Sequence, residues 1–187
     1  MNTAEQIADA ALTLFYRQGF HATGVDQLSE AAGVTKRTLY RHFPGKDHLI
    51  EAALVRRDEQ FMARMRAFIE ARAPADRPQA YIDFVLAWGH EPGFHGCAFI
   101  NAAAEFSAPQ DQPHLQASQH KQRVLAYLVQ LCQDADVMSA EQLAHQLFLL
   151  GEGLIVTMQV MGTPSPAMAN AARQTVTTWL AGATPTP

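Results

Sequence analysis

The sequence predicts an all-α protein, and three observations lead to this prediction. All ten prolines fall between, or at the edges of, stretches with a helical pattern. Proline lacks a backbone N–H and clashes with the preceding helical turn, so it marks helix ends rather than interiors. The stretches between the prolines are rich in Ala, Leu, Gln, Glu and Met, which favour helix. No window shows the sustained polar–apolar alternation with β-branched residues that is typical of a strand.

Capping signals divide these stretches into helices. In a capping box, a Ser or Thr side chain accepts a backbone N–H three residues further on, where a Gln or Glu reaches back. Candidate caps are Thr3 with Gln6, the weaker pair Thr23 with Asp26, Ser139 with Gln142, and Ser165 before Pro166. Gly19 and Gly33 stand where helices are expected to end. About nine helices are therefore expected, at residues 3–18, 25–32, 35–43, 46–72, 78–90, 97–107, 113–133, 139–162 and 166–181.

The composition indicates a large buried core. Hydrophobic residues make up 48% of the chain and charged residues 17%, against about 25% charged in typical domains. Two cysteines are too few for the disulfide framework of a small secreted protein. The first residues are polar and no run of about 18 apolar residues occurs, so we expect neither a signal peptide nor a membrane span. These observations predict a cytoplasmic protein.

The net charge of −4 conceals an uneven distribution. Residues 1–72 carry ten Lys and Arg against nine Asp and Glu, whereas residues 73–187 carry four against nine. The N-terminal segment is basic relative to the rest, which favours a local anionic partner. The alternative is that the two segments simply present different solvated faces.

The first 47 residues have the pattern of a helix-turn-helix domain. Three predicted helices follow one another with tight connections, and each has an apolar stripe. The stripes are Ile7, Ala11, Leu14 and Phe15; Val25, Leu28 and Ala32; and Val34, Leu39 and Phe43. In the second connection, Gly33 suits the turn and Val34 fills the joint. Such a pair places the third helix in a DNA major groove, which is about 12 Å wide.

The outward side chains of this third helix are the candidate DNA contacts. Once Leu39 and Phe43 are assigned to the core, cations for phosphates and donors for base edges remain. They are Thr35, Lys36, Arg37, Thr38, Tyr40, Arg41, His42 and, just beyond, Lys46. No acidic residue occurs from Val34 to Lys46. The alternative, a solvated charged face on a small bundle, is weaker because it leaves the tight joint unexplained.

Three segments resemble the TetR family of ligand-responsive repressors: residues 19–25 (GFHATGV), 31–34 (AAGV) and 38–46 (TLYRHFPGK). The resemblance implies a DNA-binding domain at residues 1–47 and a ligand-binding and dimerisation domain at 48–187. It implies a homodimer that binds a palindromic, double-stranded operator and responds to a small-molecule effector. We expect no catalytic residue, cofactor, metal or membrane partner.

The resemblance also implies roles for individual residues. Thr23 and the start of the second helix would hold a phosphate, since Gly24 stands where the family often has a hydroxyl residue. Tyr40 matches the family's phosphate-contacting tyrosine, and Lys46 the lysine that opens the fourth helix against the DNA backbone. His42 matches the histidine that follows this tyrosine in the family. Arg37 and Lys36 are the candidates for reading guanine. The positions facing base edges or backbone are Thr35, Lys36, Arg37 and Thr38.

The helices predicted at 139–162 and 166–181 are the expected dimer surface. The first is apolar nearly all round, and such a helix must be covered on every side. A partner subunit would supply the missing cover, with Gly151 and Gly153 permitting close approach. The predicted interface residues are Leu150, Leu154, Val176 and Trp179. The alternative is that both helices are central within the monomer.

A Gly- and Pro-rich loop around Gly93 and Gly96 leads into an apolar helix with aromatic side chains and a thiol at its start. In the family the effector pocket lies in the helical body, which residues 46–72 would link to the DNA-binding domain. An apolar pocket with few polar groups suits a hydrophobic or aromatic effector. The candidate lining is Trp88, Phe94, Cys97, Phe99, Asn101, Phe106, Phe148 and Met158. For each aromatic residue or methionine, the alternative is ordinary core.

Three interpretations of Cys97 remain open. With His90 and His95 it would ligate zinc, but the spacing matches no usual pattern and a fourth ligand is unassigned. As a reactive thiol at a helix N-terminus it would sense oxidants or electrophiles, or serve a thiol-dependent enzyme. As an ordinary free cysteine it would be a small core or pocket residue, as we expect for Cys132. We favour a repressor that a small ligand releases from its operator, and not an enzyme.

Overall fold

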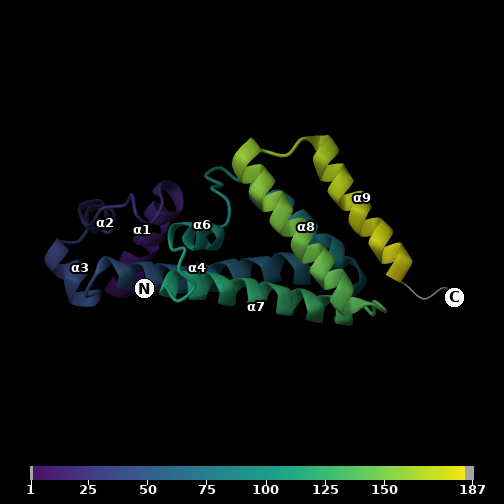
Figure 1. Cartoon of the computed structure of the whole chain (residues 1–187), viewed down its shortest axis with the longest axis horizontal. Coiled ribbons are helices and arrows are strands. Elements are labelled where there is room, and N and C mark those ends of the chain that lie inside the picture. Colours follow the sequence, from purple (N-terminus) through teal and green to yellow (C-terminus); the bar gives the residue numbers. More distant parts are fainter. Residues whose placement is uncertain (1, 184–187) are drawn as a thin grey trace. The chain divides into compact units, whose positions relative to one another are not determined.

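The computed structural model describes residues 2–183, which form nine α-helices and one 3-10 turn and include no strand in that range (Figure 1). This confirms the predicted all-α fold. The elements are α1 (Thr3–Gln18), α2 (Val25–Ala31), α3 (Lys36–His42), α4 (Lys46–Glu70), the 3-10 turn η1 (Pro74–Asp76), α5 (Arg77–Gly89), α6 (Ala98–Glu105), α7 (Gln112–Asp134), α8 (Ala140–Met161) and α9 (Pro166–Ala183). Every predicted helix end lies within two residues of the observed one.

The described residues divide into two compact units. Unit 1 comprises residues 2–61 and 97–120, and unit 2 comprises residues 62–96 and 121–183. The chain of α4 and that of α7 each pass from one unit into the other. The predicted boundary after residue 47 therefore falls inside unit 1, which also contains α6.

The caps of three helices, α1, α2 and α8, differ from the predicted ones. Asn2, rather than Thr3, caps α1: its side-chain oxygen accepts the Glu5 N–H at 2.9 Å, and Glu5 accepts the Asn2 N–H at 3.0 Å. The predicted Thr3 box is wrong because asparagine caps at least as well as threonine and lies one residue earlier. Ser139 makes no side-chain cap bond to α8, so that box is also wrong. The Ser165 cap of α9 is confirmed by a hydrogen bond that its hydroxyl accepts at 3.2 Å.

Unit 1 combines an apolar core with a charged cluster between α1 and α4. Asp9 accepts two hydrogen bonds from Arg56, at 2.9 and 3.2 Å, and one from Gln60 at 3.0 Å. A bidentate pair fixes the relative orientation of two elements more strictly than a single bond. α4 is therefore fastened to α1. The almost fully buried apolar residues of this unit include Ile7, Phe15, Phe20, Leu28, Leu39, Leu49 and Leu54.

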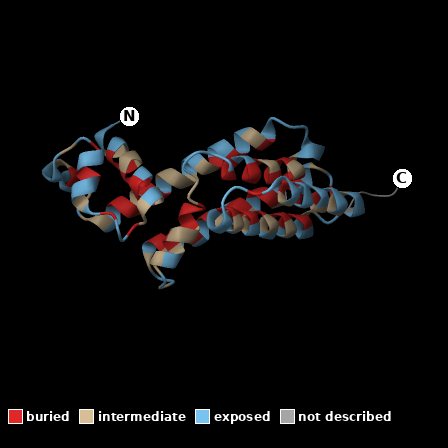
Figure 2. Cartoon of the chain, turned by 90° about the horizontal axis from the view of Figure 1, so that it is seen from above, coloured by how far each residue is buried: buried red, intermediate tan, exposed pale blue. Residues whose placement is uncertain are grey.

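Unit 2 is built around α5, which packs against both α8 and α9. All three helices contribute buried residues, and Figure 2 shows in red where residues of the chain are buried. Tyr81 of α5 is 2% exposed, and a Cβ added at Gly151 of α8 would collide with its ring. Gly151 thus permits the close α5–α8 approach, whereas the sequence had suggested that it serves a partner subunit.

α8 is long and apolar enough, by length and composition alone, to cross a membrane. Leu143, Leu147 and Ile155 on one of its faces are buried within unit 2. The helix contacts α5 and α9. Part of its apolar character therefore belongs to a core helix that packs inside a helical bundle.

Candidate nucleic-acid interface

The connection between α2 and α3 is a tight, hydrogen-bonded turn. Gly33 has φ +65°, the left-handed conformation that glycine adopts at no steric cost. The Val34 N–H donates to the Ser29 carbonyl at 3.0 Å. Thr35 then caps α3, because its hydroxyl accepts the Thr38 N–H at 3.1 Å. These bonds set the direction in which α3 leaves the turn.

α3 has one buried face and one basic, exposed face. Leu39 is fully buried, while Arg37, Arg41 and Tyr40 are exposed, with Tyr40 at 47%. Arg37 and Arg41 are four residues apart and so lie on the same side of the helix. The outward orientation predicted for these three side chains agrees with the structure. Their contacts with DNA stay a prediction.

Lys36 is paired with an acidic residue of the preceding helix. Its ammonium group forms a salt bridge with Asp26 of α2. The hydrogen bond and the charge of Asp26 raise the pKa of Lys36, which therefore stays protonated. To reach a base edge, Lys36 would have to exchange this partner for DNA. Arg37 is thus the better candidate for reading guanine.

Four predicted DNA contacts have side chains that are turned inward or already hydrogen-bonded within the protein. Thr23 is fully buried and its hydroxyl donates to the Gly19 carbonyl at 2.7 Å, so its side chain is not presented to a phosphate. His42 is half-buried, and its Nε2 is enclosed without a hydrogen-bond partner, which differs from the predicted outward face. The Thr35 and Thr38 hydroxyls lie 3.0 Å apart and hydrogen-bond each other. The Thr35 and Thr38 hydroxyls can therefore form fewer hydrogen bonds with DNA.

The turn between α1 and α2 is bonded to the start of α4. Lys46 Nζ donates to the His21 carbonyl at 3.2 Å. Gly24 caps α2 without a side-chain bond, and its N–H donates to Gln27 Oε1 at 3.0 Å. Gln27, rather than the predicted Asp26, makes the reach-back bond. The ammonium group predicted to bind a phosphate is thereby placed beside this turn.

Half of the predicted effector-site residues lie in unit 2. Trp88 is 3% exposed and meets Phe94 edge to face, with ring centroids 5.1 Å apart. Met158 is 2% exposed and lies against Gly89, where a Cβ would collide with its sulfur. Phe148 is half-buried on α8. The structure therefore brings Trp88 and Phe94 together.

The other half lie in unit 1, around α6. Phe99 is 2% exposed and stacks on His120, with ring centroids 3.8 Å apart. His120 is itself buried, with Nδ1 2.7 Å from an Asp58 carboxylate oxygen. This buried His–Asp pair gave no signal in the sequence, because its members are far apart in the chain. Asn101 is half-buried, and Phe106 contacts the turn after α1, at Phe20 and His21.

The two thiols are both buried. Cys97 is 4% exposed at the N-cap position of α6, and Cys132 is fully buried. Burial raises the pKa of the Cys132 thiol to about 12. A thiol that remains protonated at neutral pH is a poor nucleophile. Within residues 2–183, no group of three or more His, Cys, Asp or Glu side chains is placed to hold a metal ion.

The outer face of α8 differs from the predicted dimer face. Leu154 is 6% exposed and Val176 fully buried within the chain, which disagrees with the predicted exposure of both residues to a partner subunit. Leu150 and Trp179 are half-buried. The helix is apolar all round, and periodicity could not tell which side packs internally. The large exposed apolar residues are Leu149 (69%), Val156 (44%), Val160 (79%) and Met161 (75%).

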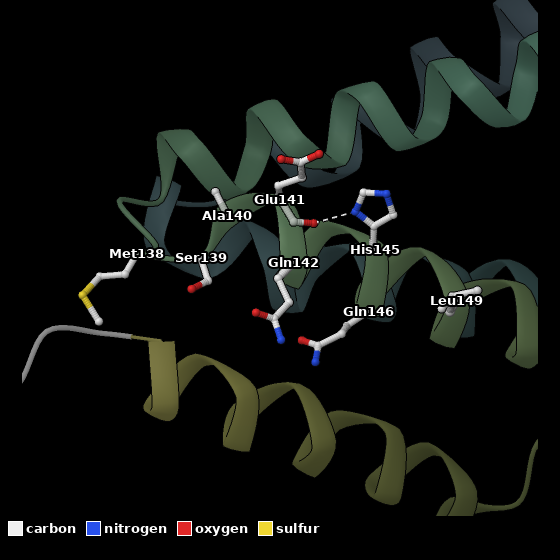
Figure 3. Close-up of a pocket in the computed structure, with 8 residues that line it drawn as sticks. All are labelled: Met138, Ser139, Ala140, Glu141, Gln142, His145, Gln146 and Leu149. Carbon is white, nitrogen blue, oxygen red and sulfur yellow. Dashed lines mark hydrogen bonds between the residues drawn. The ribbon is translucent and has the colours of Figure 1, made fainter.

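A shallow groove of mixed polar and apolar lining lies at the start of α8 (Figure 3). Its lining comes from the α7–α8 connection and the first turns of α8, and it includes none of the predicted effector-site residues. The ring of His145 is fixed by a 2.8 Å hydrogen bond between Nδ1 and the Glu141 carbonyl. Leu149 borders this groove and also begins the exposed apolar stripe of α8. The lining is Met138, Ser139, Ala140, Glu141, Gln142, His145, Gln146 and Leu149.

Comparison with known proteins matches both the N-terminal and the C-terminal part of the chain to family models. Residues 7–53 match the family model described as bacterial regulatory proteins, tetR family. Residues 74–176, more than half of the chain, match the model described as tetracyclin repressor-like, C-terminal domain. A solved TetR-family transcriptional regulator from Streptomyces coelicolor superposes with a TM-score of 0.84 at 28% identity, covering 97% of this chain and 96% of that one.

Curated relatives match over a shorter stretch. The HTH-type transcriptional regulator RutR of Escherichia coli K12 is 40% identical over 80 residues, which are 43% of this chain and 38% of RutR. The HTH-type transcriptional activator FasR of Mycolicibacterium smegmatis is 33% identical over 87 residues, 43% of this chain and 39% of FasR. The chain thus spans about two fifths of the length of these relatives. Together with the two family models, the helix-turn-helix geometry shows that the chain belongs to the tetR family of DNA-binding transcriptional regulators.

Proposed function

We propose that the protein is a homodimeric, cytoplasmic repressor that binds a palindromic operator through α3 and is released by a small hydrophobic or aromatic molecule. The observation that carries the proposal is the exposed basic face of α3, directly after a tight helix-turn-helix joint. Arg37, Tyr40 and Arg41 are presented there to a groove-sized partner. Such a regulator needs no catalytic group, which is why we propose no enzymatic activity.

Dimerisation is supported by the outer face of α8. Leu149, Val156 and Val160 are exposed at spacings of seven and four residues, which place them along one side of the helix. Gly153 on the same side is exposed and leaves room for a close backbone approach. An apolar stripe of this kind on a water-facing helix fits a partner subunit.

Release by an effector follows from linkage. A ligand that binds better to the conformation unable to engage both half-sites weakens operator binding by the difference of its two affinities, typically about 1–3 kcal/mol. The buried Trp88 of α5 and the half-buried Phe94, whose ring meets it edge to face, support an apolar ligand. Repression, rather than activation, of transcription is itself part of the proposal, because the relative FasR is named an activator.

The proposal is tested by selecting an operator with the wild-type protein from a random pool of double-stranded oligonucleotides. We expect a palindrome whose half-site centres are about 34–36 Å apart, or a multiple of that distance. Gel shifts of the selected duplex with a panel of aromatic and hydrophobic compounds then test release, and transcription of a reporter behind it tests repression. Enrichment of asymmetric sites would contradict the dimeric binding mode, and a reporter that rises with the protein would contradict repression.

The second candidate mechanism, thiol sensing through Cys97, makes a different prediction. We expect Cys97→Ser to keep its ligand response, because the substitution nearly preserves volume and a thiol only 4% exposed is poorly reached by reagents. N-ethylmaleimide and hydrogen peroxide should leave both proteins on the operator, as measured by gel shift. Cys132→Ser serves as the matched control. An oxidant that dissociates wild type and Cys132→Ser but not Cys97→Ser would establish thiol sensing.

A further inference from the structure

The turn that follows α1 is held by a carboxylate from α6, outside the three helices of the DNA-binding motif. Glu105 Oε1 accepts the Phe20 N–H at 2.9 Å, and Oε2 accepts the His21 N–H at 2.7 Å. The same Oε2 lies 3.0 Å from His21 Nδ1. One side chain therefore satisfies two consecutive backbone donors and contacts an imidazole. Hydrogen bonds to an ionised carboxylate are about twice as strong as neutral ones.

Packing around this carboxylate reinforces the contact. Phe106, the next residue, stacks on the His21 ring at 4.7 Å and meets the Phe20 ring edge to face at 6.0 Å. Gly19 has φ +91°, and a Cβ there would lie 3.0 Å from Glu105 Oε1. Glycine therefore both permits the turn and leaves room for the carboxylate. The end of α6 is fitted to this turn by shape as well as by hydrogen bonding.

We propose that Glu105 is a positioning residue for operator binding. The turn that it holds leads directly into α2, and through α2 into the recognition helix α3. The opposite side of the same turn accepts the Lys46 ammonium at the His21 carbonyl. Glu105 thus holds the backbone N–H groups of the turn. The His21 carbonyl of the same turn accepts a hydrogen bond from Lys46, the cation that is predicted to bind a phosphate. Loss of the carboxylate would loosen α2 and Lys46 together.

The proposal rests on operator binding and not on dimerisation or on an effector. Glu105→Gln is the sharpest variant, because it keeps the size of the side chain while turning one acceptor into an NH₂ donor that faces backbone N–H groups. Glu59→Gln is the matched control: the same change, in the same unit, at an exposed position on α4. The measurements are amide hydrogen exchange by NMR, thermal unfolding, and affinity for the duplex that wild type selects.

We expect the Phe20 and His21 amides of Glu105→Gln to exchange about tenfold faster or more, while amides in the α5 core keep their protection. Operator affinity should fall about three- to tenfold with little change in Tm, and Glu59→Gln should behave as wild type. A purely structural role would lower Tm and protection everywhere. If Glu105→Gln lowers Tm strongly, Glu105→Asp is measured instead and judged by the same two results.

Two outcomes would overturn the proposal. The first is exchange at Phe20 and His21 within twofold of wild type, since Glu105 would then not hold the turn. The second is faster exchange with unchanged operator affinity, since the turn would then not position the DNA-binding helices. The exchange measurement contains no DNA, so the proposed repressor function can fail without affecting its result.

Discussion

Arg37→Ala is expected to relax the operator preference at one base position and to weaken binding to the preferred sequence by about 1–3 kcal/mol, the usual discrimination of a bidentate arginine–guanine pair. Arg37 is exposed in the first turn of α3, the part of a recognition helix that meets base edges. Lys36 was an equal candidate in the sequence, but its salt bridge with Asp26 ranks it second. The measurement is operator selection repeated with the variant, followed by titration of both selected duplexes.

Tyr40→Phe is the matched control on the same helix. It removes only a hydroxyl from a side chain that is 47% exposed and is expected to contact a phosphate. Phosphate contacts carry no sequence information, so binding should weaken equally for all duplexes. The salt dependence should also stay unchanged, because no charge is removed. An Arg37→Ala protein with wild-type preference at every position would show that α3 is placed differently on DNA.

The fold was largely predictable because its signals are local. Prolines, glycines and capping residues act within one or two helical turns, and Gly19 and Gly33 indeed adopt positive φ where helices end. The basic face of α3 followed for the same reason, since the burial of Leu39 fixes which residues point outward. Even the misplaced cap at Thr3 was wrong by only one residue, because two good capping residues stand side by side.

The errors and omissions concern side-chain contacts that residue spacing in the sequence does not encode. The Asp26–Lys36 salt bridge depends on the angle between α2 and α3, which no spacing rule encodes. The Glu105 carboxylate contacts both the ring and the backbone N–H of His21, a residue more than eighty positions away in the sequence. Thr23 belongs to a recognisable motif, yet its hydroxyl is used by the Gly19 carbonyl. A motif identifies a residue type at a position, whereas its available hydrogen bonds depend on tertiary packing.

The sequence of α8 likewise does not show which of its faces packs inside the chain, and the choice of interface residues depends on this. Its sequence is apolar on nearly every side, so both Leu154 and Val156 were compatible with an interface, and Leu154 was the predicted interface residue. In the structure Leu154 is 6% exposed and Val156 is 44% exposed. Substitutions at these two residues therefore distinguish internal packing from dimerisation, although the residues are only two positions apart.

Val156→Glu is expected to give a folded monomer that has lost most of its operator affinity. The added carboxylate is solvated in the monomer but would be desolvated and unpaired in a dimer built on the α8 stripe, at a cost of several kcal/mol. Operator affinity should fall about a hundredfold or more, because the two half-sites are no longer bound by one linked molecule. Light scattering reports the assembly, circular dichroism the fold, and titration of the selected duplex the binding.

Leu154→Glu should behave differently, because its carboxylate would be buried among the apolar side chains of its own chain. An unpaired buried charge costs about 3–5 kcal/mol, a large fraction of the stability of a domain, so we expect unfolding or aggregation. Gln133→Glu, which adds the same charge at an exposed position of α7, should remain a dimer with wild-type Tm. If Val156→Glu is dimeric and binds the operator as tightly as Gln133→Glu, the subunits associate through another surface.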